Sequence, residues 1–367
     1  MRRPFFVRIM VIRIDIYKEI DPDLRDRWLT LWERNSDAHP FNHPAWFKVA
    51  PMAHKGSCKR VIVASREGRC IMFLMASVRS KKMTLLGSPY LDKASILADQ
   101  AVSGEDWQEI VESLLDKYHQ ISIQEISRRL ATDLGFDTGK ARSMTRASSL
   151  SPFFEVERPC LSGKRRHEAR RYTRKLDKDH GPMKIDFTPL NHRLLEDMAD
   201  IEGRSTKPDK GRAEFENRSY FDFLTRAIDE YGDMCWIGIM SLDGNPVAHY
   251  AGIVYGRKII GLHMAFDMKF SRYSPGTVLI FNLLPMLRER DIELFEFGRG
   301  QSVVKTRFAG DQVEPQDTVY FFKKSLLGTL GLIKARLVWA CISLGRRIRA
   351  RDMSRVNRIL DRLAIKR

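Results

Sequence analysis

The strongest chemical signal in the sequence is a helix start that follows an apolar meander. Ser274-Pro-Gly-Thr-Val278 opens an apolar run that continues to Leu287. A serine caps the first turn of a helix well, and a proline fits its first position. A small residue such as Gly276 lets backbone N–H groups approach a phosphate, whose negative charge the helix dipole favours. We therefore predict that this turn binds a pyrophosphate; a well-capped helix without a ligand is the alternative.

Two histidines lie just upstream, on stretches that have the pattern of neighbouring strands. Met234–Met240, Val247–Tyr255 and Lys258–Phe266 are apolar runs broken at Asp-Gly and Tyr-Gly-Arg, which is typical of an antiparallel meander. His249 lies on the second run and His263 on the third. Neighbouring strands would bring both imidazoles together, either as packed, hydrogen-bonded sheet residues or as groups that exchange a proton near neutral pH.

Polar residues flank the helix start on both sides. Asp267 ends the third run and Tyr273 directly precedes the helix, while Ile292–Phe297 has the pattern of a further strand. Arg299, between two glycines, and Lys305 follow that strand. The two cations either neutralise phosphates or lie on the surface. Asp267 has the alternative of capping the loop that follows it, and Tyr273 that of an ordinary loop aromatic.

Composition favours an intracellular globular protein with an anionic partner. The 367 residues include 63 bases against 46 acids, a formal charge of +17, with 43% apolar residues. This excess favours nucleotide phosphates, nucleic acid, anionic lipid or an acidic polymer. The five cysteines are scattered without metal or redox spacing, so we expect buried thiols, a reducing compartment and no metal. Arg8, Arg13 and Asp15 interrupt the first apolar run too early for a signal peptide.

The length suits two domains and a tail. Val7–Tyr17 ends in strand-like alternation and Asp21–Arg34 has helical spacing. A hairpin, a strand, a helix and two more strands follow, the last at Phe153–Val156, which predicts a mixed α+β layer domain over residues 1–158. Residues 159–326 form the second domain, in which two helices precede the meander. Residues 327–367 form the basic tail.

The order of helix, helix, meander, Ser-Pro-Gly helix, strand and glycine-rich turn resembles the GNAT acyltransferase fold. More narrowly, it resembles the GNAT-like domain shared by FemAB-type proteins and the CelD-type acetyltransferases of cellulose and exopolysaccharide biosynthesis. The resemblance extends from about Pro40 to Phe322 and implies two GNAT-like domains in tandem, with mainly antiparallel sheets flanked by helices. The matching stretches are His39–Trp46, Ser88–Asp92, Leu242–His249, Phe266-Asp267, Tyr273–Leu279 and Phe295–Gly300 with Lys305 and Phe308.

The resemblance implies acyl transfer from a thioester to an amine or hydroxyl. Positioning supplies much of the rate of such a reaction, and a base must take the acceptor's proton. We expect the catalytic residues to be His249, His263, Asp267 and Tyr273. Family members commonly carry Tyr-Lys where this chain has Val304-Lys305, so a tyrosine that protonates the leaving group must lie elsewhere or be absent.

The co-substrate implied by the resemblance is acetyl-CoA or another acyl-CoA, without a metal. Its phosphates would meet the helix start and the two downstream cations. The expected cofactor-binding residues are Ser274, Gly276, Thr277, Val278, Arg299 and Lys305. The expected acceptor is an anionic or lipid-linked saccharide.

Two basic segments point to further partners. Lys164–Lys178 holds eight bases in fifteen residues, which is either a solvated helix, a face for an anionic substrate or, less in keeping with its motifs, a nucleic-acid site. Leu327–Arg367 holds eleven bases and two acids, with apolar residues at helical spacing. Such a helix packs on the second domain or lies on an anionic membrane surface, and Lys334 and Arg336 interrupt it too much for a membrane span.

Two classes of function follow. The first is an acyl-CoA-dependent acyltransferase of cell-envelope or exopolysaccharide synthesis, cytoplasmic and peripheral at the inner face of the membrane. Within this class, a variant of the FemAB type uses aminoacyl-tRNA as donor. The second is a non-catalytic accessory protein of the same fold at the membrane.

Overall fold

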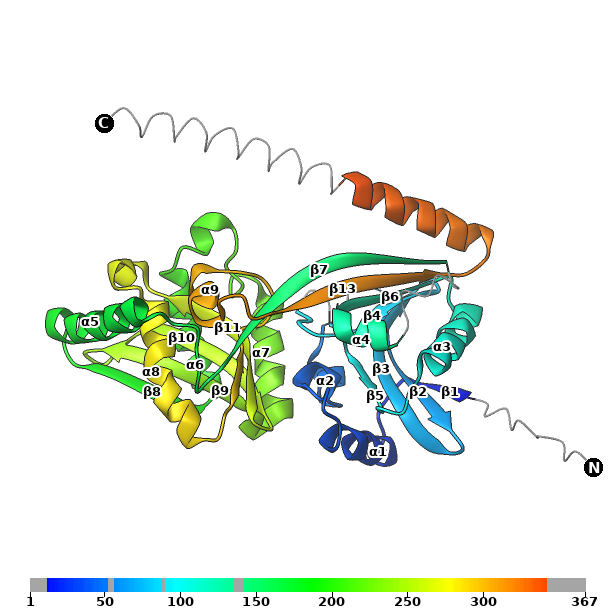
Figure 1. Cartoon of the computed structure of the whole chain (residues 1–367), viewed down its shortest axis with the longest axis horizontal. Coiled ribbons are helices and arrows are strands. Elements are labelled where there is room, and N and C mark those ends of the chain that lie inside the picture. Colours follow the sequence, from blue (N-terminus) through cyan, green and yellow to red (C-terminus); the bar gives the residue numbers. More distant parts are fainter. Residues whose placement is uncertain (1–11, 52–55, 88–89, 135–141, 342–367) are drawn as a thin grey trace, which may run out of the picture.

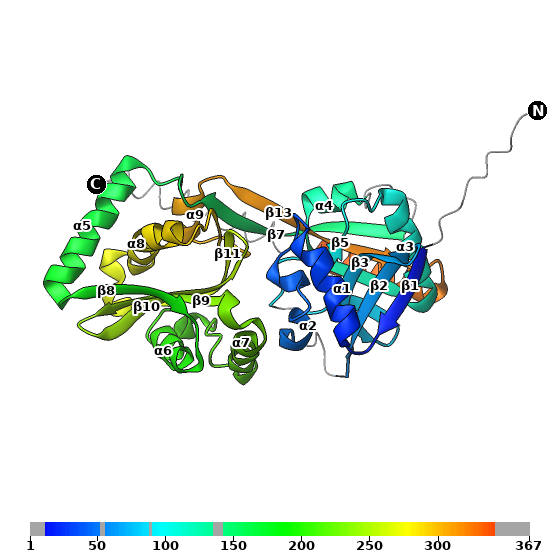
Figure 2. The ribbon, with the colours of Figure 1, turned by 90° about the horizontal axis from the view of Figure 1, so that it is seen from below.

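The protein consists of two α/β halves that lie side by side (Figure 1). The computed structural model describes residues 12–51, 56–87, 90–134 and 142–341. The two halves are joined by β7 and β13, the long strands that cross from one half to the other (Figures 1 and 2). The predicted fold class, mainly antiparallel sheets flanked by helices, is confirmed.

The first half holds the elements up to β7, and its sheet carries most of one hydrophobic core. Helix α1 begins where expected, because Asp21 accepts a hydrogen bond from the Leu24 N–H at 2.8 Å and Pro22 occupies the first position. The elements are β1 (Ile12–Tyr17), α1 (Pro22–Glu33), α2 (Trp46–Val49), β2 (Cys58–Arg66), β3 (Arg69–Arg79), β4 (Lys82–Leu85), β5 (Ile96–Ala98), α3 (Gly104–Lys117), β6 (Gln120–Ser127), α4 (Arg128–Asp133) and β7 (Arg142–Glu155).

The second half confirms the predicted meander and its flanking helices. Helices α5 and α8 cover one face of its sheet, and α6 and α7 the other (Figure 2). The elements are α5 (Gly163–His180), β8 (Met183–Pro189), α6 (His192–Gly203), the short 3-10 helix η2 (Pro208–Lys210), α7 (Arg218–Tyr231), β9 (Cys235–Leu242), β10 (Asn245–Tyr255), β11 (Lys258–Phe266), the 3-10 helix η4 (Met268–Tyr273), α8 (Pro275–Glu289), β12 (Leu294–Glu296), α9 (Val303–Ala309) and β13 (Val313–Phe322).

Both halves repeat one order of strand pairing. In the first half, β1 to β4 pair antiparallel in sequence and β4 then pairs parallel to β6. In the second half, β8 to β11 pair antiparallel and β11 pairs parallel to β12. A helix, α3 or α8, makes each connection to the parallel strand.

The strand that follows each repeat is exchanged between the halves. Strand β7, which follows the first repeat, pairs with β12 of the second, whereas β13, the last strand, pairs with β6 of the first. The two exchanged strands also pair with each other. The proposed boundary near Arg158 therefore lies just after a strand that is already part of the second sheet.

Several strands escaped sequence analysis. Strands β8 and β13 were not predicted, and β7 was expected only at Phe153–Val156 although it begins at Arg142. Strand β7 is rich in serine and arginine, so it lacks the apolar alternation that signals a strand. Its pairing on both sides comes from segments that are remote in sequence.

The start of α8 was predicted correctly, but its cap was not. Ser274 has a left-handed backbone (φ 51°, ψ 57°), and its side chain makes no capping hydrogen bond. Its carbonyl oxygen instead accepts from the N–H groups of Thr277 and Val278 at 2.9 and 3.1 Å. The prediction of a capping serine is therefore wrong, because the turn out of η4 fixes the Ser274 backbone.

Residues 326–341 form a helix along the outside of the molecule (Figure 1). Its exposed apolar side chains include Leu326, Leu330, Leu337 and Trp339. The rest of the predicted basic tail lies outside the described residues. Within the described parts of the chain, no helix is both long and apolar enough to span a membrane.

The exchange of β7 and β13 should make the two halves unfold together. Phe154 on β7 is fully buried and its ring lies 4.9 Å from that of Phe295 and 5.5 Å from that of Phe308. We expect Phe154→Ala to lower the free energy of unfolding by about 3–5 kcal/mol in one transition, measured by urea titration. Leu150→Ala, at an exposed position of the same strand, should change it by less than about 0.5 kcal/mol. Two separate transitions would contradict this coupling.

Candidate functional site

The candidate site lies where β11 and β12 separate. Their parallel pairing covers only three residue pairs and ends at Ile260–Glu296. A bulge follows at once on β11, because Ala251 pairs with His263 and Gly252 with Gly261, which leaves Leu262 without a partner on β10. A Cβ on Gly261 would lie 2.7 Å from the Tyr250 hydroxyl, so only glycine fits at this turn of the strand.

A cavity of about 360 Å³ fills this opening. Both halves contribute to its lining, which includes charged, phenolic and imidazole side chains. The residues are Tyr90 and Asp92 from the first half and Lys207, Glu214, Tyr220, Phe223, Tyr250, Gly261, Leu262, His263, Met264, Phe297, Arg299, Ser302 and Lys305 from the second.

The two predicted histidines form a hydrogen-bonded pair beside the cavity. His249 Nε2 lies 2.7 Å from His263 Nδ1, and the two rings stack with centroids 5.0 Å apart. His263 Nε2 lies 2.8 Å from Glu202 Oε1. All three residues are buried, so Glu202, His263 and His249 form a continuous chain that can carry a proton away from the cavity. Among the described residues, His249 Nδ1 has no hydrogen-bond partner.

Burial determines the charge states in this chain. Burial lowers the pKa of His263 below 6.5, although the Glu202 carboxylate, which would accept a hydrogen bond from the imidazolium, opposes this, and burial lowers the pKa of His249 further. Burial opposes ionisation of Glu202, yet the adjacent His263, a hydrogen bond from the Phe215 N–H and the Lys207 ammonium bring the pKa of Glu202 to about 2. At neutral pH the site therefore holds neutral imidazoles next to an ionised carboxylate.

Lys207 and Glu214 complete the group around His263. Lys207 Nζ lies 2.7 Å from His263 Nε2 and 2.9 Å from Glu202 Oε1. Glu214 Oε2 lies 3.3 Å from His263 Nε2. Glu202, Glu214 and His263 have ligand atoms close enough to one another to hold a metal ion, and the Lys207 ammonium lies among them.

A second charged group lies at the side of the cavity nearest the first half. The Asp92 carboxylate lies 3.3 Å from Arg299 Nε, and burial raises the pKa of Asp92 to about 6 even though Arg299 and Lys305 oppose this. Gly298 has φ +71°, and a Cβ there would lie 2.7 Å from Asp92 Oδ2. Lys305 Nζ donates to the carbonyl oxygens of Gly298 and Arg299, so it holds the glycine-rich turn in place.

The predicted phosphate-binding turn lies next to the cavity without lining it. Gly276 is buried, and a Cβ there would lie 3.4 Å from both Met264 and Val304. Thr277 accepts a hydrogen bond from Arg307 at 2.8 Å, and Val278 is fully buried. Side chains of β11 and α9 therefore cover this turn of α8.

Two predicted catalytic residues lie apart from the histidine pair. Asp267 accepts from Arg204 at 2.5 Å and from the Lys269 N–H at 2.8 Å, which is the capping geometry of the alternative interpretation. The Tyr273 hydroxyl donates to Asp179 at 2.8 Å and lies 3.2 Å from His180 Nε2. Tyr273 thus joins η4 to α5.

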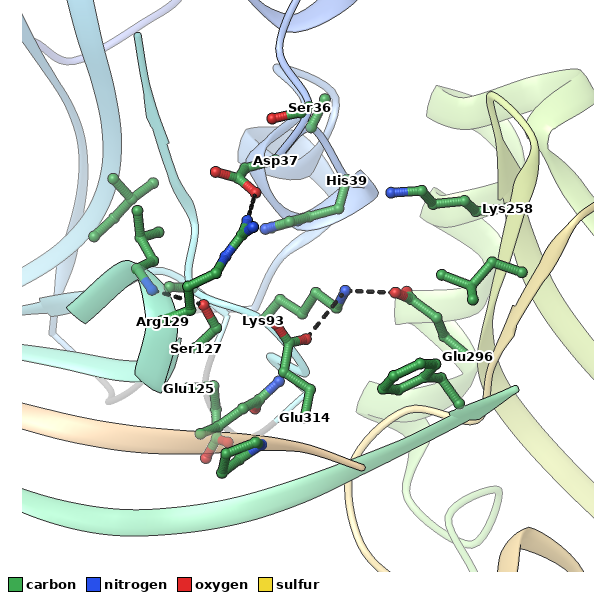
Figure 3. A pocket seen from close by; sticks show the side chains of 18 of the residues that line it. Ser36, Asp37, His39, Lys93, Glu125, Ser127, Arg129, Lys258, Glu296 and Glu314 are labelled. Atoms are coloured by element: carbon green, nitrogen blue, oxygen red, sulfur yellow. Dashed lines mark hydrogen bonds and ion pairs between the residues drawn. The ribbon is translucent and has the colours of Figure 1, made fainter. Parts of the chain in front are cut away.

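A larger cavity of about 550 Å³ lies between the two halves (Figure 3). Its central Lys93 is paired with Glu296 at 2.7 Å and Glu314 at 3.6 Å, and Arg129 is paired with Asp37 at 2.6 Å. The acidic and basic side chains that line this cavity largely compensate one another (Figure 3). Its titratable chain runs from Tyr255 through Glu296 to Lys93 and contains no imidazole, so the smaller cavity, which holds the histidine pair, is the better candidate for proton transfer near neutral pH.

Several residues of the site were not among the predicted site residues. Tyr90 and Asp92 lay within a stretch that carried the family resemblance, whereas Lys207 lies on the segment between the two helices that precede the meander. Glu202 carried no signal, because a glutamate near the end of an amphipathic helix is ordinary. Tyr220, on α7, and Glu214, on the segment before α7, can likewise be recognised only from their contacts with His263 on β11.

Residues 163–306 match the family model described as the acetyltransferase (GNAT) domain. The matched segment includes Glu202, His249 and His263, so the part of the chain that is similar to the acetyltransferase (GNAT) domain holds the histidine pair. No curated protein matches the sequence significantly.

Several solved structures share the fold of nearly the whole chain. A C-terminal domain assigned to a lysylphosphatidylglycerol synthetase of Agrobacterium fabrum has 15% identity and a TM-score of 0.54, over 86% of this chain and 95% of that one. L-PGS from Bacillus licheniformis has 14% identity and a TM-score of 0.54, over 86% and 96%. FemX has 10% identity and a TM-score of 0.54, over 82% and 96%. At these identities the likeness shows a common fold alone.

Asp92 should make stability depend on pH in an unusual direction. Its pKa is about 6 in the folded protein against 3.8 as the ordinary value, so the folded state holds the extra proton between these values and loses stability as pH rises. We expect the free energy of unfolding, relative to Asp92→Asn, to fall by about 2–3 kcal/mol between pH 4 and pH 7. Urea titrations of both proteins at several pH values measure this. A difference that stays constant with pH would contradict it.

Proposed function

We propose that this protein is an acyltransferase that moves an acyl group, in the first place acetyl, from coenzyme A to an amine or hydroxyl of a cell-envelope or exopolysaccharide precursor. The observation that carries the proposal is the Glu202–His263–His249 chain at the separation of β11 and β12, within the segment that matches the acetyltransferase domain.

His263 is the proposed general base. Its imidazole is neutral at pH 7 because burial lowers its pKa, so it can accept the acceptor's proton as the new bond to the acyl carbon forms. Ionised Glu202 then stabilises the resulting imidazolium at 2.8 Å. Backbone N–H groups at the edge of β11 beyond Ile260, where pairing with β12 ends, suit the negative charge that develops on the carbonyl oxygen.

The proposed donor site lies between the start of α8 and the glycine-rich turn. Residues 274–278 are the proposed pyrophosphate contacts, with Arg299 and Lys305 nearby. Met264 lines the cavity and lies against Gly276, so a donor that runs from the helix start into the cavity must displace this side chain. This chain has Val304 where related proteins carry a tyrosine that could protonate the leaving group. Tyr90, Tyr220 and Tyr250 line the same cavity, and their hydroxyls are the candidates for that role.

An aminoacyl-tRNA donor is the second candidate. Helix α5 favours it, because most of its bases are exposed and only Ala169 and Leu176 are buried. A basic face of this kind suits RNA phosphates as well as an anionic saccharide.

A peripheral position on a membrane is part of the proposal. The helix over residues 326–341 exposes apolar side chains, among them Leu330 and Leu337 at 54% and 62%, and the sequence after it is strongly basic. This combination suits an anionic lipid surface. A lipid-linked saccharide acceptor would lie in the same membrane surface.

Calorimetric titration with acetyl-CoA and with free coenzyme A tests the donor. We expect micromolar binding of both. His263→Ala should keep this binding and lower the release of coenzyme A thiol, measured with a panel of amino sugars and sugars, by about 10²–10⁴-fold, because the general base is lost. His192→Ala is the matched control, since His192 is exposed and pairs with Asp229 on the surface.

Failure of both compounds to bind would contradict the coenzyme A donor. Salt-dependent binding of tRNA in the same samples would then favour the aminoacyl donor. Binding of neither kind of donor would favour a non-catalytic protein.

Binding to vesicles tests the membrane position. We expect the full chain to bind vesicles that contain anionic lipid, and Leu337→Asp to weaken this binding roughly tenfold or more, because a buried leucine contributes about 1.5–3 kcal/mol. Leu150→Asp makes the same change at another exposed leucine and should leave binding unchanged. Equal effects of the two substitutions, measured by co-sedimentation, would contradict a role for this helix.

A further inference from the structure

A lysine of the protein itself occupies the reactive end of the candidate site. The Lys207 ammonium faces three acceptors: His263 Nε2 at 2.7 Å, Glu202 Oε1 at 2.9 Å and Glu214 Oε2 at 3.7 Å. An ammonium has three N–H donors and no acceptor. The three N–H groups of the Lys207 ammonium therefore match the three groups around it. We call the site formed by His263, Glu202 and Glu214 the ammonium seat.

The ammonium seat is built from fixed, buried groups. Glu202 is 1% exposed, and its second oxygen accepts from the Phe215 N–H at 2.8 Å. The His263 side chain is fully buried, and the Phe215 and Tyr220 rings lie against it at 5.1 and 5.7 Å. A buried carboxylate without a counter-charge is costly. The seat therefore requires a cation whenever Glu202 is ionised.

Lys207 enters the seat from the outside of the protein. It lies on the segment between α6 and α7, directly before η2, and its side chain remains 28% exposed. Its neighbours Asp209, Lys210 and Gly211 are all exposed. The segment is held by backbone hydrogen bonds within itself, such as that from the Arg212 N–H to the Lys207 carbonyl. The lysine side chain can therefore withdraw without any change in α6, β10 or β11.

We propose that Lys207 is an internal stand-in for the acceptor, and that the acceptor is a primary amine, which binds as an ammonium after displacing Lys207. That the amine is the acceptor in acyl transfer rests on the proposed function, whereas the existence of the ammonium seat does not. A hydroxyl acceptor would leave Glu202 and Glu214 without a counter-charge once Lys207 leaves. An amine restores that charge and, as an ammonium, donates an N–H to His263 Nε2, the atom that Lys207 now contacts. His263 takes this proton, the neutral amine then attacks the thioester carbonyl, and the second proton leaves with the coenzyme A sulfur as the thiol. The protein thus inhibits its own site until an amine competes for the seat.

Chemical rescue of Lys207→Ala tests the seat without any donor. The substitution removes three methylene groups and the ammonium, which n-propylammonium replaces. We expect the variant to unfold at a lower temperature than the native protein, and millimolar n-propylammonium chloride to raise that temperature and to bind at least tenfold more tightly to the variant than to the native protein, by calorimetry. 1-Propanol has the same shape without the charge and should do neither.

Two further variants separate a specific seat from a general effect. Lys210→Ala, on the same exposed segment, should behave as the native protein. Lys207→Met keeps an unbranched stem in the path and removes the charge, so n-propylammonium should rescue it poorly. If Lys207→Ala does not fold unaided, refolding that depends on n-propylammonium and not on 1-propanol is the expected result.

Three outcomes would overturn the inference. They are equal rescue by propanol, no effect of n-propylammonium on Lys207→Ala, and tight binding of Zn²⁺ by that variant with no response to the amine, which would make the seat a metal site. Because no thioester is present, a failure here leaves binding of acetyl-CoA to be judged on its own. A failure of acetyl-CoA to bind likewise does not alter the rescue.

Discussion

The end of the pairing between β11 and β12 is the constraint on which the rest of the structure depends. Three residue pairs hold the two strands together, and the bulge at Leu262 then turns β11 away. The opening that results is lined on one side by the His263 group and on the other by the glycine-rich turn at Gly298. A longer ladder would close the cavity and leave His263 as an ordinary residue of the sheet.

The exchange of strands keeps that opening in a fixed relation to the first half. Because β7 completes the second sheet and β13 completes the first, neither half has its full sheet without the other. Asp92 reaches Arg299 across this junction, and Lys93 reaches Glu296 in the larger cavity. The candidate site is therefore a property of the whole chain, although the segment that matches the acetyltransferase domain covers only its second half.

Burial and the neighbouring polar groups together set the protonation states in the site. Burial drives both histidines to the neutral state and makes Asp92 a weak acid, whereas Glu202 remains ionised because His263, the Phe215 N–H and Lys207 offset its burial. An ionised buried carboxylate next to a neutral imidazole is suited to receive a cation and to take a proton from it. Lys207 now fills that role, which explains how such a group is stable in the absence of a substrate.

Much of the fold could be read from the sequence where the pattern is local. The meander, the helices α1, α6, α7 and α8 and the neighbourhood of His249 and His263 follow from apolar periodicity, turns and caps, which act over a few residues. The exchanged strands β7 and β13, the seat of Glu202 and the approach of Asp92 to Arg299 did not follow. Each of these joins residues far apart in the chain, and their energies arise only when burial and pairing bring the partners together. The sequence by itself determined which residues could do chemistry, and the tertiary structure decided that His263 would do it beside Glu202 and Lys207 rather than beside Asp267 and Tyr273.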